Sequence, residues 1–308
     1  MRISTQQIFE IGAARIGDLQ ARLQKTQDQI STGRRILTAS DDPVGATRAL
    51  EITQSQSVNN QYGVNRMYAK NTLSQAEVTL EGVTELFQDV KTAIISARNG
   101  VLNDSQRGYH ATELSGRLQQ LLGLANTRDE SGNYLFSGFQ TNTPAFVQTA
   151  TGATYQGDLG QKLIQVDATR QMASNTPGST VFQGGAPGGA EDVFKTLTDL
   201  VSLLQTPVVT PADSAALAAG LATASTNMDL ALENVLTTRA AMGSRLQEID
   251  SLDSLGEDRD LQYSQALSAI QDLDYTQAIT QLSQQKVTLE AAQQSFVQTS
   301  KLSLFNYI

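Results

Sequence analysis

The sequence lacks the residues on which many catalytic and metal sites depend. It has no cysteine, no tryptophan and a single histidine, His110. Disulfides, thiolate metal sites, cysteine nucleophiles and multi-histidine metal sites are therefore excluded. A Ser–His–Asp triad would have to use His110, and no hydrolase, metalloprotease or EF-hand motif is present. We predict that the chain is not an enzyme and holds no cofactor or metal. A site assembled from scattered carboxylates is the enzymatic alternative that remains open.

Long apolar runs and positive charge are also scarce. Only 17% of the 308 residues are charged, and the net charge is −9, which argues weakly against a nucleic-acid partner. No apolar run approaches the roughly 20 residues that a membrane-spanning helix needs, so we expect no membrane insertion. The first residues lack the apolar stretch of a Sec signal peptide, and we expect the chain not to use that route.

Prolines divide the chain into segments of different composition. Residues 44–143 and 212–308 contain none, as long helices require. Between them, residues 134–194 hold seven of the 17 aromatic residues, with short alternating stretches bounded by turn residues. We predict a mainly α protein with a helical core domain at residues 43–140 and 190–270 and a small β-rich insert at 141–189.

The two proline-free stretches carry apolar residues at alternating spacings of three and four. This spacing predicts helices that pack lengthwise in a long coiled-coil-like bundle, and a plain compact bundle is the alternative. The positions are Leu73, Ala76, Leu80, Val83, Phe87, Val90, Ile94, Ala97 and Val101, then Ala111, Leu114, Leu118, Leu121 and Ala125, and later Leu221, Ala224, Met228, Ala231, Val235, Met242, Ile249 and Leu252.

Both ends of the chain carry similar stripes. We predict an N-terminal assembly helix and turn at residues 1–42 and a C-terminal assembly helix at 271–308. Terminal helices fray unless they are held, so the two ends are expected to pair with each other or with another subunit. The predicted assembly interface consists of Phe9, Ile16, Leu19, Leu23, Ile30, Leu282, Leu289, Phe296, Leu304 and Phe305.

Residues 40–43, Ser-Asp-Asp-Pro, predict a helix start. Asp41 or Asp42 would cap free backbone N–H groups, and Pro43 would occupy the first turn. With Gly33, these residues form the predicted turn and helix cap. A carboxylate pair that binds a metal or acts as acid and base is the alternative, but it has no partner cluster nearby in the sequence.

Several segments resemble signatures of the bacterial flagellin family. Residues 29–46 (QISTGRRILTASDDPVGA) are similar to its N-terminal signature, and residues 238–246 (TRAAMGSRL) and 272–279 (DLDYTQAI) to its C-terminal ones. Residues 1–5 (MRIST) and 303–308 (SLFNYI) most resemble the members that join hook to filament. A filament-forming flagellin and, less favoured, an unrelated coiled-coil interaction module remain as alternatives.

The resemblance implies a structural flagellar subunit at the hook–filament junction, secreted unfolded through the flagellar type III pathway. It implies terminal helices that pack in concentric layers around a secretion channel. The implied partners are further copies in a homo-oligomeric ring, a neighbouring hook-associated protein, flagellin, and a cytoplasmic export chaperone that binds the C-terminal region.

Overall fold

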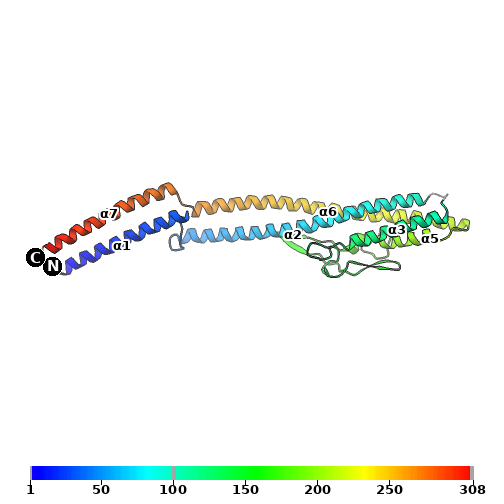
Figure 1. The fold of residues 1–308 in the computed structure, drawn as a ribbon, viewed down its shortest axis with the longest axis horizontal. Coiled ribbons are helices and arrows are strands. Elements are labelled where there is room, and N and C mark those ends of the chain that lie inside the picture. Colours follow the sequence, from blue (N-terminus) through cyan, green and yellow to red (C-terminus); the bar gives the residue numbers. More distant parts are fainter. Residues whose placement is uncertain (1, 99–101, 306–308) are drawn as a thin grey trace. The chain divides into compact units, whose positions relative to one another are not determined.

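The computed structural model describes residues 2–98 and 102–305, and its helices and strands are shown in Figure 1. Long helices dominate these residues, which confirms the predicted mainly α fold. The helices are α1 (Arg2–Thr32), α2 (Pro43–Ala97), α3 (Asp104–Ala125), α4 (Gly178–Gln183), α5 (Val193–Gln205), α6 (Pro211–Gln271) and α7 (Tyr275–Phe305). The strands are β1 (Phe146–Thr149), β2 (Gly152–Tyr155), β3 (Leu163–Asp167) and β4 (Arg170–Ala173).

The chain divides into two compact units. The terminal unit comprises residues 1–59 and 257–308, and the central unit comprises residues 60–256. The two longest helices, α2 and α6, each contribute to both units.

The hydrophobic core belongs to the central unit. The apolar positions predicted from the three–four spacing form one line along each helix, called the seam below. Every seam position of α2 from Leu73 to Ala97 is buried, and so are those of α3. In α6 the seam is buried from Leu221 to Ile249, while Leu252 packs partly buried against the core; Val101 lies outside the described residues. Side chains spaced by three and four residues lie on one face of a helix, which explains this continuous core.

Ion pairs along α2 and α6 show that these helices run antiparallel within the central unit. Lys91 pairs with Asp229 at 2.5 Å, Glu77 with Arg239 at 2.7 Å, and Lys70 with Asp250 at 2.7 Å. The position along α6 rises as the position along α2 falls. Most of these groups are partly exposed, so each pair adds little stability while the apolar seam carries the packing.

Local sequence signals explain where the helices begin. Both α2 and α6 begin at a proline. Proline is favourable at the first position of a helix, because a backbone N–H there would have no acceptor within the helix and nothing is lost by its absence. Helix α3 is preceded by Asn103, whose side chain accepts the backbone N–H of Gln106 at 2.8 Å. The Gln106 side chain in turn accepts the Asn103 N–H at 3.0 Å. This reciprocal pair is a capping box.

The predicted β-rich insert consists of two separate hairpins and the short helix α4. Strands β1 and β2 pair antiparallel with Phe146 opposite Tyr155, and β3 and β4 pair antiparallel with Leu163 opposite Ala173. An aromatic cluster packs beneath the first hairpin. The Phe146 ring lies 4.7 Å from that of Phe194 and 5.5 Å from that of Phe182, measured between centroids. Large buried rings supply this small β region with the apolar surface that its short strands lack.

Candidate assembly interface

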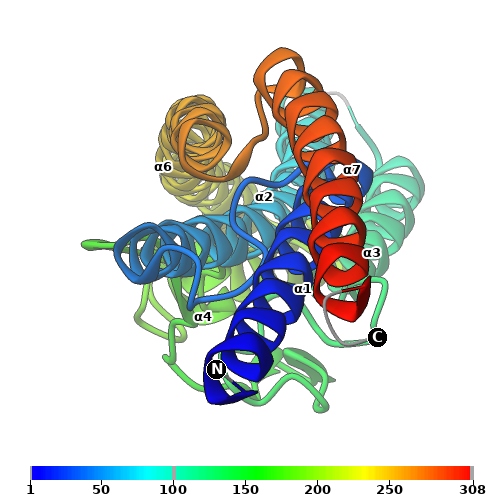
Figure 2. The same ribbon diagram turned by 90° about the vertical axis from the view of Figure 1, so that its left-hand side faces the viewer.

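Helices α1 and α7 form an antiparallel pair in the terminal unit. The Phe9 and Phe296 rings lie 4.9 Å apart near one end of the pair, and Thr26 donates a hydrogen bond to Gln285 at 3.0 Å farther along. Figures 1 and 2 both show the two helices side by side. The beginning of the chain is thereby paired with its end.

The predicted interface residues follow the line of contact between the two helices. Phe9 lies at the open end with 52% of its surface exposed. The remaining predicted residues whose side chains are described are half-buried: Ile16, Leu19, Leu23, Ile30, Leu282, Leu289 and Phe296. Leu304 and Phe305 lie in the last turn of α7, and their side chains are outside the described ones. The pair therefore leaves much of its apolar surface accessible.

Small and polar residues that the apolar pattern missed complete the seam. Thr26 is only 3% exposed and Ala278 4%, although one is polar and the other small. Gly12, Gln285 and Ala292 are half-buried on the same faces. These positions continue the three–four spacing, so the spacing would have found them had it not been read from large apolar side chains alone.

Two turns lie against each other where α1 and α7 meet the longer helices. Gly33 follows α1 with a φ of +70°, a left-handed conformation that glycine adopts readily. Its carbonyl accepts the Leu273 N–H at 3.0 Å. Arg35 donates its backbone N–H to the Gln271 carbonyl at 2.7 Å and its guanidinium to the Ile270 carbonyl at 2.8 Å. Backbone pairing thus joins the segment after α1 to the segment before α7.

The two aspartates of the first turn have separate structural tasks. Asp42 accepts the Gly45 N–H at 2.8 Å at the N-terminus of α2, directly before Pro43. Asp41 instead accepts the N–H groups of Leu37 at 3.2 Å and Thr38 at 3.1 Å, which closes the turn.

A lysine of α1 adds to the charge balance of this turn. Lys25 donates to Asp41 at 2.6 Å. This hydrogen bond, supported by the N–H of Thr38, lowers the pKa of the Asp41 carboxyl to about 2. Because Asp41 and Asp42 are both occupied by backbone and side-chain donors, their carboxylates organise the turn.

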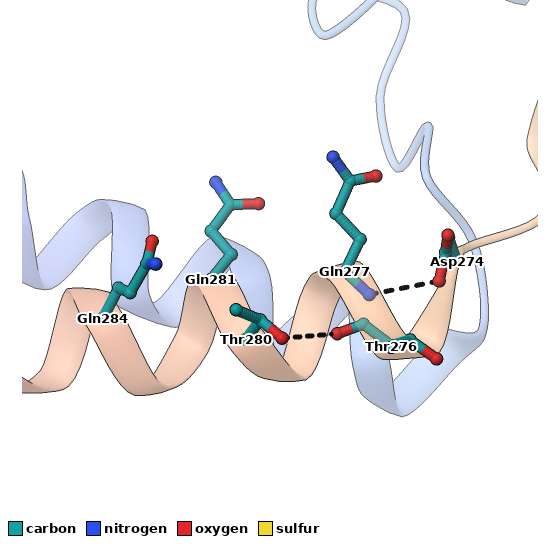
Figure 3. Close-up of a pocket in the computed structure, with 6 residues that line it drawn as sticks. All are labelled: Asp274, Thr276, Gln277, Thr280, Gln281 and Gln284. Carbon is teal, nitrogen blue, oxygen red and sulfur yellow. Dashed lines mark hydrogen bonds between the residues drawn. The ribbon is translucent and has the colours of Figure 1, made fainter.

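The start of α7 carries a shallow hollow lined by polar side chains, among them the carboxylate of Asp274. Asp274 accepts the Gln277 N–H at 3.1 Å, and the Thr280 hydroxyl donates to the Thr276 carbonyl at 2.8 Å (Figure 3). Gln277, Gln281 and Gln284 project from the helix beside them (Figure 3). The hollow brings this carboxylate together with amides and hydroxyls of α7, which makes it a polar surface at the start of the helix.

Apolar side chains also point away from the seam. On α7, Ile279 is 54% exposed, Val287 64% and Val297 49%, and Ile11 of α1 is similarly exposed.

Within residues 2–98 and 102–305, no helix is long and apolar enough to cross a membrane. The same ranges contain no group of three His, Cys, Asp or Glu side chains placed to hold a metal ion.

Comparison with known proteins matches this arrangement to one family. Residues 3–141 match the bacterial flagellin N-terminal helical region. The chain is 36% identical to flagellar hook-associated protein 3 of Escherichia coli K12 and 35% identical to that of Salmonella typhimurium LT2, over 99% of both chains in each case. The chain belongs to the flagellar hook-associated protein 3 family. It is a structural subunit of the bacterial flagellum at the hook–filament junction, as the sequence predicted.

A solved structure supports the same assignment. The structure of a flagellar hook-associated protein from Vibrio parahaemolyticus superposes with a TM-score of 0.67 at 25% identity. The match covers 75% of this chain and all of that protein.

Proposed function

We propose that copies of the chain assemble into a homo-oligomeric ring through the terminal unit, between a neighbouring hook-associated protein and flagellin. We further propose that the role is purely structural, without enzymatic activity. The observation that supports the ring is the difference in burial between the two units. Among the described residues, the buried apolar side chains of the terminal unit are Ala49 and Ala278, whereas the large buried side chains belong to the central unit.

This distribution leaves the terminal unit short of stabilising contacts. Burial of apolar surface contributes about 25 cal/mol per Å², and isolated helices are marginal in water without a packed face. The exposed side chains of Ile279, Val287 and Val297 are available to gain this energy against neighbouring subunits. Assembly would therefore stabilise the helices that a single chain packs poorly.

Hydrogen exchange tests the dependence on assembly. In the free subunit, we expect backbone amides at residues 5–30 and 280–300 to exchange quickly, while α2 and α6 of the central unit stay protected. In isolated flagella, the same terminal amides should become protected. Strong protection of both terminal segments in the free subunit would contradict the proposal.

Two classes of α7 variant separate pairing from assembly. Leu289→Asp places a charge between α1 and α7, so we expect it to disrupt the pair and abolish assembly. Val287→Asp changes the outward surface, so it should abolish assembly while the pair remains. Val209→Asp, at a loop valine that is 83% exposed in the central unit, is the matched control.

Complementation of a strain that lacks the protein provides the readout. Val209→Asp should restore motility, and neither α7 variant should. The interface assignment is wrong if Val287→Asp restores motility as well as the control does. Immunogold labelling of flagella then shows whether the active variants sit in one band at the distal end of the hook, as the junction role requires, or along the filament.

Export in an unfolded state is a further part of the proposal. The chain has no cysteine, so no disulfide opposes unfolding before export. We propose that a cytoplasmic chaperone covers the C-terminal region, including the exposed apolar residues of α7. Deletion of residues 275–308 should abolish copurification of that chaperone from the cytoplasm, and retention of the chaperone by the shortened chain would refute this part.

A further inference from the structure

The apolar residues of the α1–α7 pair do not by themselves determine how far one helix is displaced along the other. They recur every seven residues: Phe9, Ile16, Leu23 and Ile30 on α1, and Leu282, Leu289 and Phe296 on α7. Sliding α7 by seven residues would again set large apolar side chains opposite large apolar side chains. Since apolar burial is not directional, this repeat alone permits several registers.

A polar pair formed by the buried Thr26 and the half-buried Gln285 distinguishes between these registers. The Thr26 hydroxyl contacts Gln285 Oε1 at 3.0 Å and the Arg22 carbonyl at 3.1 Å within a seam of leucine and isoleucine. A slide of seven residues would place Ala278 or Ala292 opposite Thr26. Thr26 can still donate to its own helix, but the Gln285 amide would lose its partner. An unpaired polar group in a seam costs free energy, and a single polar seam residue is known to specify register.

The contact between Gly12 and Phe296 also distinguishes the observed register from the two slid ones. A Cβ atom at Gly12 would lie 2.7 Å from Phe296 Cδ2, so the ring occupies space that only glycine leaves. A slide in one direction would bring Phe296 against Leu19, where the ring has no such space. A slide in the other direction would place Leu289 over Gly12 and leave a void.

We propose that Thr26–Gln285 and Gly12–Phe296 together specify a single antiparallel register for the terminal helices. The two contacts lie at different levels of the pair, so they restrict the same displacement independently. This inference concerns pairing within one chain and does not depend on the ring. It identifies these four residues as specificity-determining residues for the proposed assembly surface.

The absence of native cysteine permits a direct measurement of register. Leu19→Cys with Leu289→Cys reports the observed register, because these positions lie one heptad inward from Gly12 and Phe296 on both helices. Leu19→Cys with Leu282→Cys reports a slide in one direction, and Leu23→Cys with Ala292→Cys a slide in the other. Seven residues correspond to about 10 Å along a helix, which is beyond disulfide reach.

Mild oxidation of the purified full-length chain traps even a pair that forms only transiently, and non-reducing electrophoresis then gives the yield of intramolecular disulfide for each reporter. In the otherwise native background, the reporter of the observed register should exceed both slid reporters by about tenfold. Adding Thr26→Val, Gln285→Leu and Phe296→Leu removes both register contacts and makes the seam more apolar. That background should lower the preference by about tenfold while pairing persists.

The control background carries Gln24→Leu and Thr288→Val, which make similar chemical changes at exposed positions of the same helices. It should keep the native preference. The proposal is overturned if the native background shows no preference for the observed register, or if the preference survives in the background that lacks both contacts. Either result is independent of whether subunits assemble, because only intramolecular disulfides are scored.

Discussion

Phe146 provides a quantitative test of how the β hairpins are attached to the helices. It is 1% exposed, and its ring contacts Phe194, Phe182 and Tyr155 at centroid distances between 4.7 and 5.5 Å. Its backbone is held as well. Asn126, at the end of α3, donates to the Phe146 carbonyl at 2.8 Å and accepts the Phe146 N–H at 2.9 Å. Phe146→Ala would remove the ring while keeping these backbone bonds.

The expected loss of stability follows from burial. Replacing a fully buried phenylalanine with alanine costs about 3–5 kcal/mol, because apolar contacts are lost and a cavity remains. For a unit of this size, each kcal/mol shifts Tm by roughly 2–4 °C. The Phe146→Ala variant should therefore unfold about 6–20 °C below the parent protein.

Scanning calorimetry of the full-length chain measures this shift in the central unit. Phe139→Ala is the matched control, because it is the same substitution in the same region at a side chain that is 60% exposed. We expect the control to change stability by no more than about 0.5 kcal/mol. If Phe146→Ala lowers Tm no more than Phe139→Ala does, the aromatic cluster does not hold the hairpin to the helices.

Two further predictions concern the terminal unit. The lowered pKa of Asp41 means that its stabilising contribution is present above its ordinary unfolded pKa of about 3.9 and is lost as pH falls towards about 2. Lys25→Met should raise that pKa in an NMR carboxyl titration, and an unchanged value would show that Lys25 is not its main cause. Gly17→Ala should slow amide exchange in α1, because alanine improves helix propensity by about 1 kcal/mol and nothing lies within 4 Å of the new Cβ. Gly12→Ala should speed exchange instead, because its Cβ would overlap Phe296 at a cost of about 1–3 kcal/mol; equal effects of the two variants would refute the close contact.

The helical part of the fold was predictable because one physical signal dominates it. Leu73, Leu80 and Phe87 recur every seven residues in a stretch without proline, and all three are fully buried. The start of α2 at Pro43 was predicted as well, because the effect of proline on a helix is local. Features that depend on neighbouring residues in the sequence could therefore be located from the sequence itself.

Contacts between residues far apart in the sequence were harder to predict. The sequence indicated a β-rich insert, but the contact of Phe146 with Phe194 joins residues 48 positions apart, and no local periodicity encodes it. The same limit applies to the Thr26–Gln285 hydrogen bond, which joins opposite ends of the chain. Thr26 interrupted the apolar pattern, and only its partner explains why a polar side chain is buried there.

The contrast between the units shows that three–four spacing predicts which helices pair but not whether the pair is stable by itself. Both carry residues at three–four spacing. In α2 the seam positions Leu80, Val83 and Phe87 are fully buried, so the central unit can supply its own core. In α1 the corresponding sequence of positions includes Gly12 and Thr26, and its larger apolar residues stay half-exposed. Small and polar seam residues reduce the apolar energy of a single pair while restricting its register. A pair built in this way is weak alone, yet it presents one defined surface when further subunits add the missing contacts.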